Sequence, residues 1–402
     1  MLVNNSVSPA PTGKIVAARV TTNWLEDGAS RSAQWRSESG IAVPSRIVIA
    51  DDKTNADAAY RLACEGTALL WRGDFQNARQ LMLAMARRID KQAARRMDDV
   101  DALTPRDIFH RGRQQQARRA RLLGMLLLQF DADHHLSLRR APDVRAACTE
   151  AFGASPEAYV MSLRELLGAI GAHEWRKNGV MVAALGAKIH PHYGVFAPIR
   201  NEYLDLVTNA PLPSKTLAFD IGTGTGVLSA ILARRGVASV VATDLDMRAI
   251  ACARENIERL GVGDQVTLLQ TDLFPLHRAP LIVCNPPWLP AQPSSRLEHA
   301  VYDPDSRMLR GFLSGLAAHL EADGEGWLIM SDLAEHLGLR SRDELLAWIV
   351  EGGLRVIGRI DTSPKHPRTR DATDPLHVAR AAEITSLWRL GLANPSLASF
   401  AN

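Results

Sequence analysis

A glycine-rich turn separates an apolar run from a helical pattern in the second half of the chain. The apolar run covers residues 217–219, and the turn contains Asp220, Gly222, Gly224 and Gly226. Glycines between a strand and a helix let the backbone approach a ligand closely, while helix N–H groups point at that ligand. A dinucleotide turn would have glycine where Val227 stands, and the chain has no Gly-Lys-Ser/Thr phosphate loop. The turn therefore indicates a ligand site of another kind.

Two acidic residues follow the next two predicted strands. Asp244 follows the run 240–243, and Asp272 follows the run 266–270. In an open parallel sheet the carboxyl ends of the strands meet at one edge, beside the point where strand order reverses. An acid about twenty residues after a glycine turn can accept hydrogen bonds from both hydroxyls of a ribose. Each acid could instead cap a helix, but three acids in register with the turn favour a binding edge.

The strand predicted at 280–284 ends in Asn-Pro-Pro-Trp, residues 285–288. Two prolines fix the backbone and remove two donors, so the loop is stiff and its carbonyls remain free to accept. The Asn285 side-chain oxygen and the Pro286 carbonyl can hold both hydrogens of an amino group, which turns the nitrogen lone pair toward an electrophile. Trp288 offers a flat face for a planar group. A turn with a core tryptophan is the alternative.

In this order and spacing the motifs resemble those of class I S-adenosylmethionine-dependent methyltransferases, over about residues 190–392. Asn-Pro-Pro-aromatic resembles their small-domain group, which includes release-factor glutamine methyltransferases and methyltransferases of exocyclic base amines. The usual aromatic is Tyr or Phe, so Trp288 departs from the pattern. The resemblance implies Asn285, Pro286 and Trp288 as catalytic residues that hold the acceptor. It implies S-adenosyl-L-methionine as the cofactor, bound by Asp220, Gly222, Thr223, Gly224, Gly226, Asp244, Asp272, Leu273 and Asn285.

Short apolar runs alternate with amphipathic stretches from residue 217 onward, a pattern typical of βα units that build a parallel sheet. The predicted fold class is therefore α/β. The resemblance implies a seven-stranded Rossmann-like sheet with a final antiparallel hairpin, whose last three strands are predicted at 327–330, 354–360 and 384–390. We predict a loosely ordered lead-in over 1–50, a mainly helical N-terminal domain over 51–190 and the methyltransferase domain over 191–402.

The N-terminal half is basic. Residues 1–195 contain 27 Lys and Arg against 20 Asp and Glu, whereas the remainder contains 20 against 24. A helix is expected to begin at Thr104-Pro105, and basic residues gather around it: Arg87, Arg88, Arg95, Arg96, Arg111, Arg113, Arg118, Arg119 and Arg121. They could meet the phosphates of a nucleic acid, or form a solvated helical face. We expect this domain to recognise the substrate.

Two further segments leave the predicted catalytic edge. Glu298 and Tyr302, after the Asn-Pro-Pro-Trp loop, are candidates for an acceptor wall. The proline-rich basic loop 363–371 is expected to hang over the same edge or to form a solvated hairpin tip.

Composition excludes several classes of protein. The chain has 402 residues, 46% of them apolar and 23% charged, which is unlike a disordered or collagenous chain. No apolar run is long enough to cross a bilayer, and the first residues do not resemble a secretory signal. The four cysteines are widely spaced, and His190 and His192 lack a third nearby ligand. We expect a cytoplasmic protein with no metal and no membrane partner.

The predicted function is S-adenosylmethionine-dependent N-methylation of a planar amide or exocyclic amine. The acceptor could be glutamine in a protein, a base in RNA or DNA, or a small heteroaromatic metabolite. Two alternative functions from other protein classes remain. A nicotinamide-dependent oxidoreductase is disfavoured by Val227 and leaves the Asn-Pro-Pro-Trp loop without a role, and a non-catalytic cofactor-binding partner protein would bind without turnover.

Overall fold

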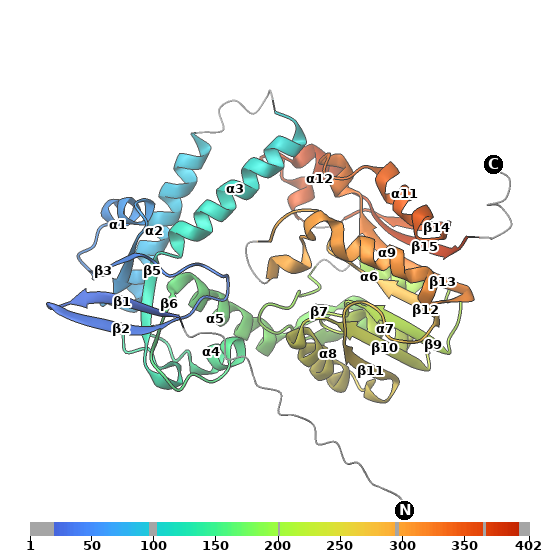
Figure 1. Ribbon diagram of the computed structural model, residues 1–402, viewed down its shortest axis with the longest axis horizontal. Coiled ribbons are helices and arrows are strands. Elements are labelled where there is room, and N and C mark those ends of the chain that lie inside the picture. Colours follow the sequence, from blue (N-terminus) through green and yellow to red (C-terminus); the bar gives the residue numbers. More distant parts are fainter. Residues whose placement is uncertain (1–19, 96–102, 200–201, 294–296, 365–366, 394–402) are drawn as a thin grey trace, which may run out of the picture.

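The computed structural model describes residues 20–95, 103–199, 202–293, 297–364 and 367–393. The chain forms two α/β units side by side, and one long helix runs from the first unit to the second (Figure 1). The first unit contains a six-stranded sheet and the second a seven-stranded sheet.

The seven-stranded sheet has the order β11-β10-β9-β12-β13-β15-β14. Its first five strands are parallel, and β15 runs antiparallel to both β13 and β14. This order confirms the predicted seven-stranded sheet and its final antiparallel hairpin. The strands are β9 (Leu217–Ile221), β10 (Ser239–Asp244), β11 (Val266–Gln270), β12 (Ala279–Cys284), β13 (Leu320–Ser331), β14 (Leu354–Thr362) and β15 (Thr385–Leu392).

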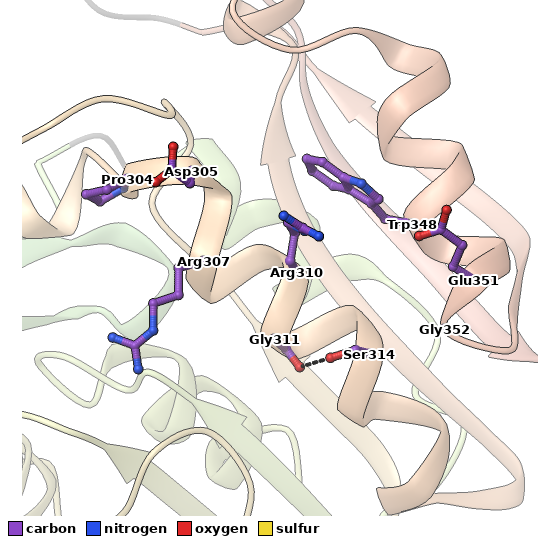
Figure 2. Close-up of a pocket in the computed structure, with 9 residues that line it drawn as sticks. All are labelled: Pro304, Asp305, Arg307, Arg310, Gly311, Ser314, Trp348, Glu351 and Gly352. Atoms are coloured by element: carbon purple, nitrogen blue, oxygen red, sulfur yellow. Dashed lines mark hydrogen bonds between the residues drawn. The ribbon is translucent and has the colours of Figure 1, made fainter.

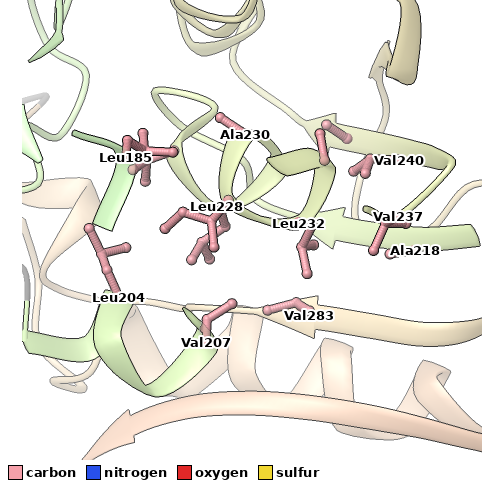
Figure 3. Close-up of a cluster of buried hydrophobic side chains, with 14 of the residues drawn as sticks. Leu185, Leu204, Val207, Ala218, Leu228, Ala230, Leu232, Val237, Val240 and Val283 are labelled. Carbon is pink, nitrogen blue, oxygen red and sulfur yellow. The ribbon is translucent and has the colours of Figure 1, made fainter. Parts of the chain in front are cut away.

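Helices cover both faces of this sheet because its central strands are apolar on both sides. All six residues of β12 are buried, as expected for a strand in the middle of a parallel sheet. One core cluster joins α6 and α7 to the sheet (Figure 3), and another joins α9 and α11 to the opposite face. The helices are α6 (Glu202–Asn209), α7 (Val227–Arg234), α8 (Met247–Arg259), α9 (Arg307–His319), α10 (Leu333–His336), α11 (Arg342–Glu351) and α12 (His377–Ala382).

The first unit corrects the prediction of a mainly helical domain, because its helices pack on a mixed sheet of order β1-β2-β6-β5-β4-β3. The strands are β1 (Thr21–Glu26), β2 (Ala29–Trp35), β3 (Arg46–Ala50), β4 (Thr67–Trp71), β5 (Leu126–Phe130) and β6 (Tyr159–Ser162). The helices are α1 (Ala56–Cys64), α2 (Phe75–Ala94), α3 (Pro105–Leu123), α4 (Arg145–Phe152) and α5 (Leu163–Asn178). Residues 126–130, which follow α3 directly, form strand β5, and all of them but Gln129 are buried.

The lead-in predicted over 1–50 is also wrong for its described part, because residues 21–50 contain three strands of the first sheet. Its earlier residues, 1–19, lie outside the described residues. Strands β1 and β2 form a hairpin at one edge, and β3 forms the other edge, parallel to β4. The many Ser, Asn and Gly residues of this segment lie in an exposed hairpin. Only alternate residues of its strand β1 face the core.

The boundary predicted at residue 190 falls too late. The hairpin of β7 (Val180–Val182) and β8 (Ala187–Ile189) precedes it, yet Val182, Leu185 and Ile189 belong to the core of the second unit. Figure 3 shows Leu185 beside residues of α6 and α7. The division falls instead after α5, where Gly179 has a positive φ of 69°.

Helix α3 connects the two units. Thr104 caps it by accepting from the backbone N–H of Asp107, and Pro105 occupies its first turn, which confirms the predicted start. Its side chain Phe109 is buried against the second unit, in a cluster with Leu289, Leu333, Ala334, Leu337, Leu376 and Ala379. Most other residues of α3 are exposed along its length. The helix is therefore anchored at one end by an apolar contact between the units.

We expect Phe109→Ala to lower the midpoint of thermal unfolding by several degrees. Removing a buried phenyl ring costs about 3–5 kcal/mol in a well-packed core, and about 1 kcal/mol shifts the midpoint of a domain this size by a few degrees. Gln114→Ala is the matched control, because Gln114 is exposed on the same helix. Scanning calorimetry of both variants makes the comparison, and equal midpoints would contradict the apolar contact.

Candidate active site

The side chain of Asp220 holds the glycine turn to the end of β9. Its carboxylate, fully buried at the end of β9, accepts through Oδ2 from the Thr223 hydroxyl at 2.7 Å and from the Ser229 hydroxyl and N–H at 2.5 and 3.0 Å. Its Oδ1 has no hydrogen-bond partner among the described residues. Burial raises the pKa of Asp220, against these three hydrogen bonds. Asp220 thus ties the strand end to the first turn of α7 and leaves one buried acceptor unused.

Two glycines of the turn are required for different reasons. Gly224, at φ 55°, has no atom within 4 Å of the position that a Cβ would take, so open space lies over the backbone there. Gly226, at φ 80°, would place a Cβ 3.2 Å from Cα of Ala253 on α8. Gly224 therefore allows a ligand to approach, whereas Gly226 allows α7 and α8 to pack. Gly222 faces Met308, on the first turn of α9.

Asp244 lies at the end of β10, next to the turn. Its Oδ2 accepts from the N–H of Gly224 at 3.0 Å and its Oδ1 from the N–H of Asp246 at 2.9 Å. Each carboxylate oxygen can accept a further hydrogen bond. Burial raises the pKa of Asp244, while these backbone N–H groups lower it. The geometry gives the predicted ribose acceptor two oriented oxygens with remaining capacity.

Asp272 and Leu273 close the third loop of this edge. The carboxylate of Asp272 is exposed and pairs with Arg307 of α9 at 3.2 Å, and Leu273 adopts a positive φ of 64° with its carbonyl accepting from Thr243 at 2.6 Å. Arg307 therefore competes for the carboxylate that the sequence assigned to cofactor binding. Both predicted residues lie at the edge, and their roles toward a cofactor stay predictions.

The Asn-Pro-Pro-Trp loop leaves β12 beside β9, because these strands pair in parallel and Cys284 is in register with Ile221. Pro286 is buried, while Asn285 and Trp288 are half-buried. The indole N–H of Trp288 donates to Oδ1 of Asn285 at 3.0 Å. The structure therefore brings the predicted acceptor residues next to the glycine turn, and it adds a contact within the loop that the sequence did not predict.

Tyr203 on α6 is a site residue that the sequence analysis missed. It is 3% exposed, its hydroxyl lies beside the Asn285 side chain, and its ring meets that of Trp288 edge to face with centroids 6.5 Å apart. Burial raises the pKa of Tyr203, so the phenol keeps its proton at neutral pH. No spacing rule links residue 203 to residue 285, and only the docking of α6 on the sheet brings them together.

Glu298 and Tyr302 contact α3 of the first unit. The Arg113 guanidinium pairs with Glu298 at 2.9 Å, lies 3.9 Å from the ring centre of Tyr302 and donates to the Gln292 carbonyl at 2.7 Å. Gln116 also donates to Glu298. Glu298 and Tyr302, the candidates for an acceptor wall, thus hold α3 next to the segment that follows Trp288. In the other candidate loop, Lys365 and His366 lie outside the described residues.

A cavity of about 640 Å³ opens between α9 and α11, lined by Pro304, Asp305, Arg307, Arg310, Gly311, Ser314, Trp348, Glu351 and Gly352 (Figure 2). It includes none of the predicted site residues. Within the described ranges, no group of three or more potential ligand side chains could hold a metal ion, and no helix there has both the length and the apolarity to span a membrane.

Comparisons with known proteins match this part of the chain. Residues 204–297 match the model of the family Ribosomal protein L11 methyltransferase (PrmA). The tRNA1(Val) (adenine(37)-N6)-methyltransferase of Shewanella loihica is 28% identical over 199 residues, 46% of this chain and 79% of that protein. The release factor glutamine methyltransferase of Cereibacter sphaeroides is 37% identical over 119 residues, 26% of this chain and 43% of that protein. The ribosomal protein L11 methyltransferase of an Exiguobacterium species is 52% identical over 55 residues, 14% of this chain and 18% of that protein.

The second unit is similar to class I S-adenosylmethionine-dependent methyltransferases in its matched family model, its relatives and its strand order. The predicted family, enzyme class and cofactor are confirmed. So is the predicted class of reaction, because the relatives' names describe methyl transfer to an adenine N6 or to glutamine. The chain spans most of the tRNA methyltransferase but under half of the release-factor enzyme.

The described residues fit S-adenosylmethionine. The unused Oδ1 of Asp220 is an acceptor at the floor of the turn, the space over Gly224 admits a ligand, and Asp244 has free acceptor capacity. Asp220 and the turn would hold the methionine part and Asp244 the ribose.

We expect Asp244→Asn to weaken binding of S-adenosylhomocysteine about ten- to hundredfold. Charge-assisted hydrogen bonds contribute about 1.5–3 kcal/mol, and the amide would replace one acceptor oxygen by a donor. Wild-type affinity should also fall as the pH is lowered through the raised pKa of Asp244, because only the carboxylate accepts two hydroxyls. Calorimetry over a pH series measures both effects, with the exposed Asp264→Asn as control. Equal affinity of Asp244→Asn and the wild type would contradict the ribose assignment.

Proposed function

We propose that this protein transfers a methyl group to the exocyclic amino nitrogen of a base in RNA. The observation that carries the proposal is the stiff Asn285-Pro286-Pro287-Trp288 loop, which follows a buried strand directly beside the glycine turn. A carbonyl pair held by two prolines suits a planar amino group, because such a group has two N–H donors in one plane.

Methyl transfer depends on the positioning of the two reactants more than on acid or base catalysis. S-adenosylmethionine, when bound, supplies a methyl group activated on a sulfonium. Asn285 and Pro286 would accept the two amino hydrogens and hold the nitrogen lone pair in line, and Trp288 would support the ring. Holding two reactants in line can supply about 7–11 kcal/mol of the barrier. The amine becomes acidic as the new bond forms, so its proton can leave to water.

Two observations favour RNA over a protein acceptor. This chain covers 79% of a relative from Shewanella loihica that is named as a tRNA1(Val) (adenine(37)-N6)-methyltransferase. The basic helix α3 also lies against the segment that follows the acceptor loop, through Arg113. Helix α3 contains six arginines and one aspartate. This net positive charge would attract the phosphates of a nucleic acid.

Glutamine in a protein is the second candidate. Release factor glutamine methyltransferases match at 37% identity, over 43% of the Cereibacter protein. A glutamine side chain offers the same planar amino group to Asn285 and Pro286. The two acceptors differ in what surrounds that group, because a protein substrate carries no phosphate backbone.

We expect labelled methyl groups from S-adenosylmethionine to enter RNA, and the label to digest to N-methylated nucleoside. Separate incubations with RNA, DNA, protein and small-molecule fractions of cells distinguish the acceptors. Asn285→Ala should bind cofactor almost as the wild type does but lose about a hundred- to a thousandfold in turnover, by analogy with loss of one group that orients the reacting atoms. Label in protein alone would show that the methyl acceptor is a protein glutamine and not RNA. Full activity of Asn285→Ala would overturn the proposed role of Asn285 in holding the acceptor.

Affinity for RNA should fall steeply between about 50 and 200 mM salt, because bound phosphates release counterions. The double reversal Arg111→Glu and Arg118→Glu should weaken binding and flatten this salt dependence. Neither arginine has an ion pair recorded within the described residues, whereas Arg119 pairs with Asp90 at 2.9 Å. The double reversal Arg46→Glu and Arg61→Glu, on β3 and α1, changes the net charge by the same amount and is the control. Filter binding at several salt concentrations tests this, and equal salt slopes for the α3 reversal and the control would remove α3 from the interface.

A further inference from the structure

The orientation of the Asn285 amide is fixed by the chemistry of its neighbour. An indole N–H can only donate a hydrogen bond. The Asn285 side-chain atom 3.0 Å from Nε1 of Trp288 is therefore the carbonyl oxygen and not the amide nitrogen. A carbonyl oxygen has two lone pairs, so one remains for an amino group of the acceptor.

Tyr203 supplies a second point of contact on the same side chain. Its hydroxyl lies beside the Asn285 side chain, and its ring packs edge to face against Trp288. The terminal torsion of an asparagine is otherwise broad, because rotation about an sp³–sp² bond has low barriers. The hydrogen bond from Trp288 restricts that rotation, and Tyr203 packs against the indole that donates it. Both partners belong to rigid surroundings, since Tyr203 is buried in the core cluster of the second unit and Trp288 packs against that cluster.

We propose that Tyr203 and Trp288 are positioning residues that hold the Asn285 carbonyl oxygen toward the acceptor amine. This inference rests on the proposed role of Asn285 in holding the acceptor. It gives Trp288 a function that a phenylalanine at the same position could not perform, because phenylalanine has no N–H. The departure from Tyr or Phe at residue 288 is thereby explained by a hydrogen bond within the loop, in addition to any contact with the acceptor ring.

Steady-state kinetics of Tyr203→Phe and Trp288→Phe provide the first test. Loss of the Trp288 N–H, or of the Tyr203 hydroxyl beside the amide, should lower kcat about two- to tenfold, because a net hydrogen bond contributes about 0.5–1.5 kcal/mol. In Tyr203→Phe we expect KM for the acceptor and affinity for S-adenosylhomocysteine to change less than twofold, since Tyr203 would act through Asn285. Tyr60→Phe removes a hydroxyl that bonds Gln92 in the first unit, and is the matched control.

A double-mutant cycle separates positioning from general support of the fold. On the Asn285→Ala background, Tyr203→Phe should cause no further loss of the single-turnover rate, because the group that it orients is gone. An equal loss on both backgrounds would mean that Tyr203 acts elsewhere, and wild-type kcat in both single variants would also overturn the inference. If Asn285→Ala itself is fully active, the proposed function fails instead.

A measurement without turnover follows the indole N–H of Trp288 by NMR. Its resonance is assigned by its disappearance in Trp288→Phe. We expect it to exchange slowly with solvent in the wild type, and to shift and exchange faster in Asn285→Ala, because the acceptor oxygen is lost. A smaller shift is expected in Tyr203→Phe. An unchanged resonance in Asn285→Ala would show that the Trp288–Asn285 bond does not form, and would overturn the inference independently of activity.

Discussion

The hydrogen bonds to the buried carboxylate of Asp220 hold together the sheet edge that we propose binds the cofactor. A charge in the interior is costly unless donors surround it, and here three donors from Thr223 and Ser229 converge on one oxygen. They fix the glycine turn to the end of β9 and to the start of α7. The backbone of Gly224 in turn donates to Asp244, which links this strand end to the next one.

The acceptor side is held by contacts from outside the sheet. Tyr203 reaches the Asn-Pro-Pro-Trp loop from α6, and Arg113 reaches the segment behind that loop from the first unit. Arg113 is bonded to a carboxylate and a carbonyl at once, which gives the contact direction as well as charge. The first unit is thereby joined to the segment that follows the Asn-Pro-Pro-Trp loop, and its Glu38 also pairs with Arg248 at the start of α8 at 3.1 Å.

The sequence predicted the second unit well because its signals are local. The glycine turn, the acids at strand ends and the two prolines each follow a short apolar run, and parallel pairing brings such ends to one edge. The secondary structure of the first unit was harder to predict, because an apolar run such as 67–71 fits a buried strand or a helix segment equally well. Tyr203 could not be found from spacing. Its contact with Asn285 joins positions far apart in the chain, and the tertiary packing of α6 creates it.

We propose that the methyl donor and the acceptor meet between the glycine turn and the Asn-Pro-Pro-Trp loop. A crystal structure with S-adenosylhomocysteine tests it most directly. We expect the ribose hydroxyls on Asp244, and the sulfur facing the Asn285 side-chain oxygen and the Pro286 carbonyl across a gap that admits one methyl group and one amino nitrogen. A product bound with its sulfur turned away from Asn285, or bound in the cavity between α9 and α11, would contradict the account.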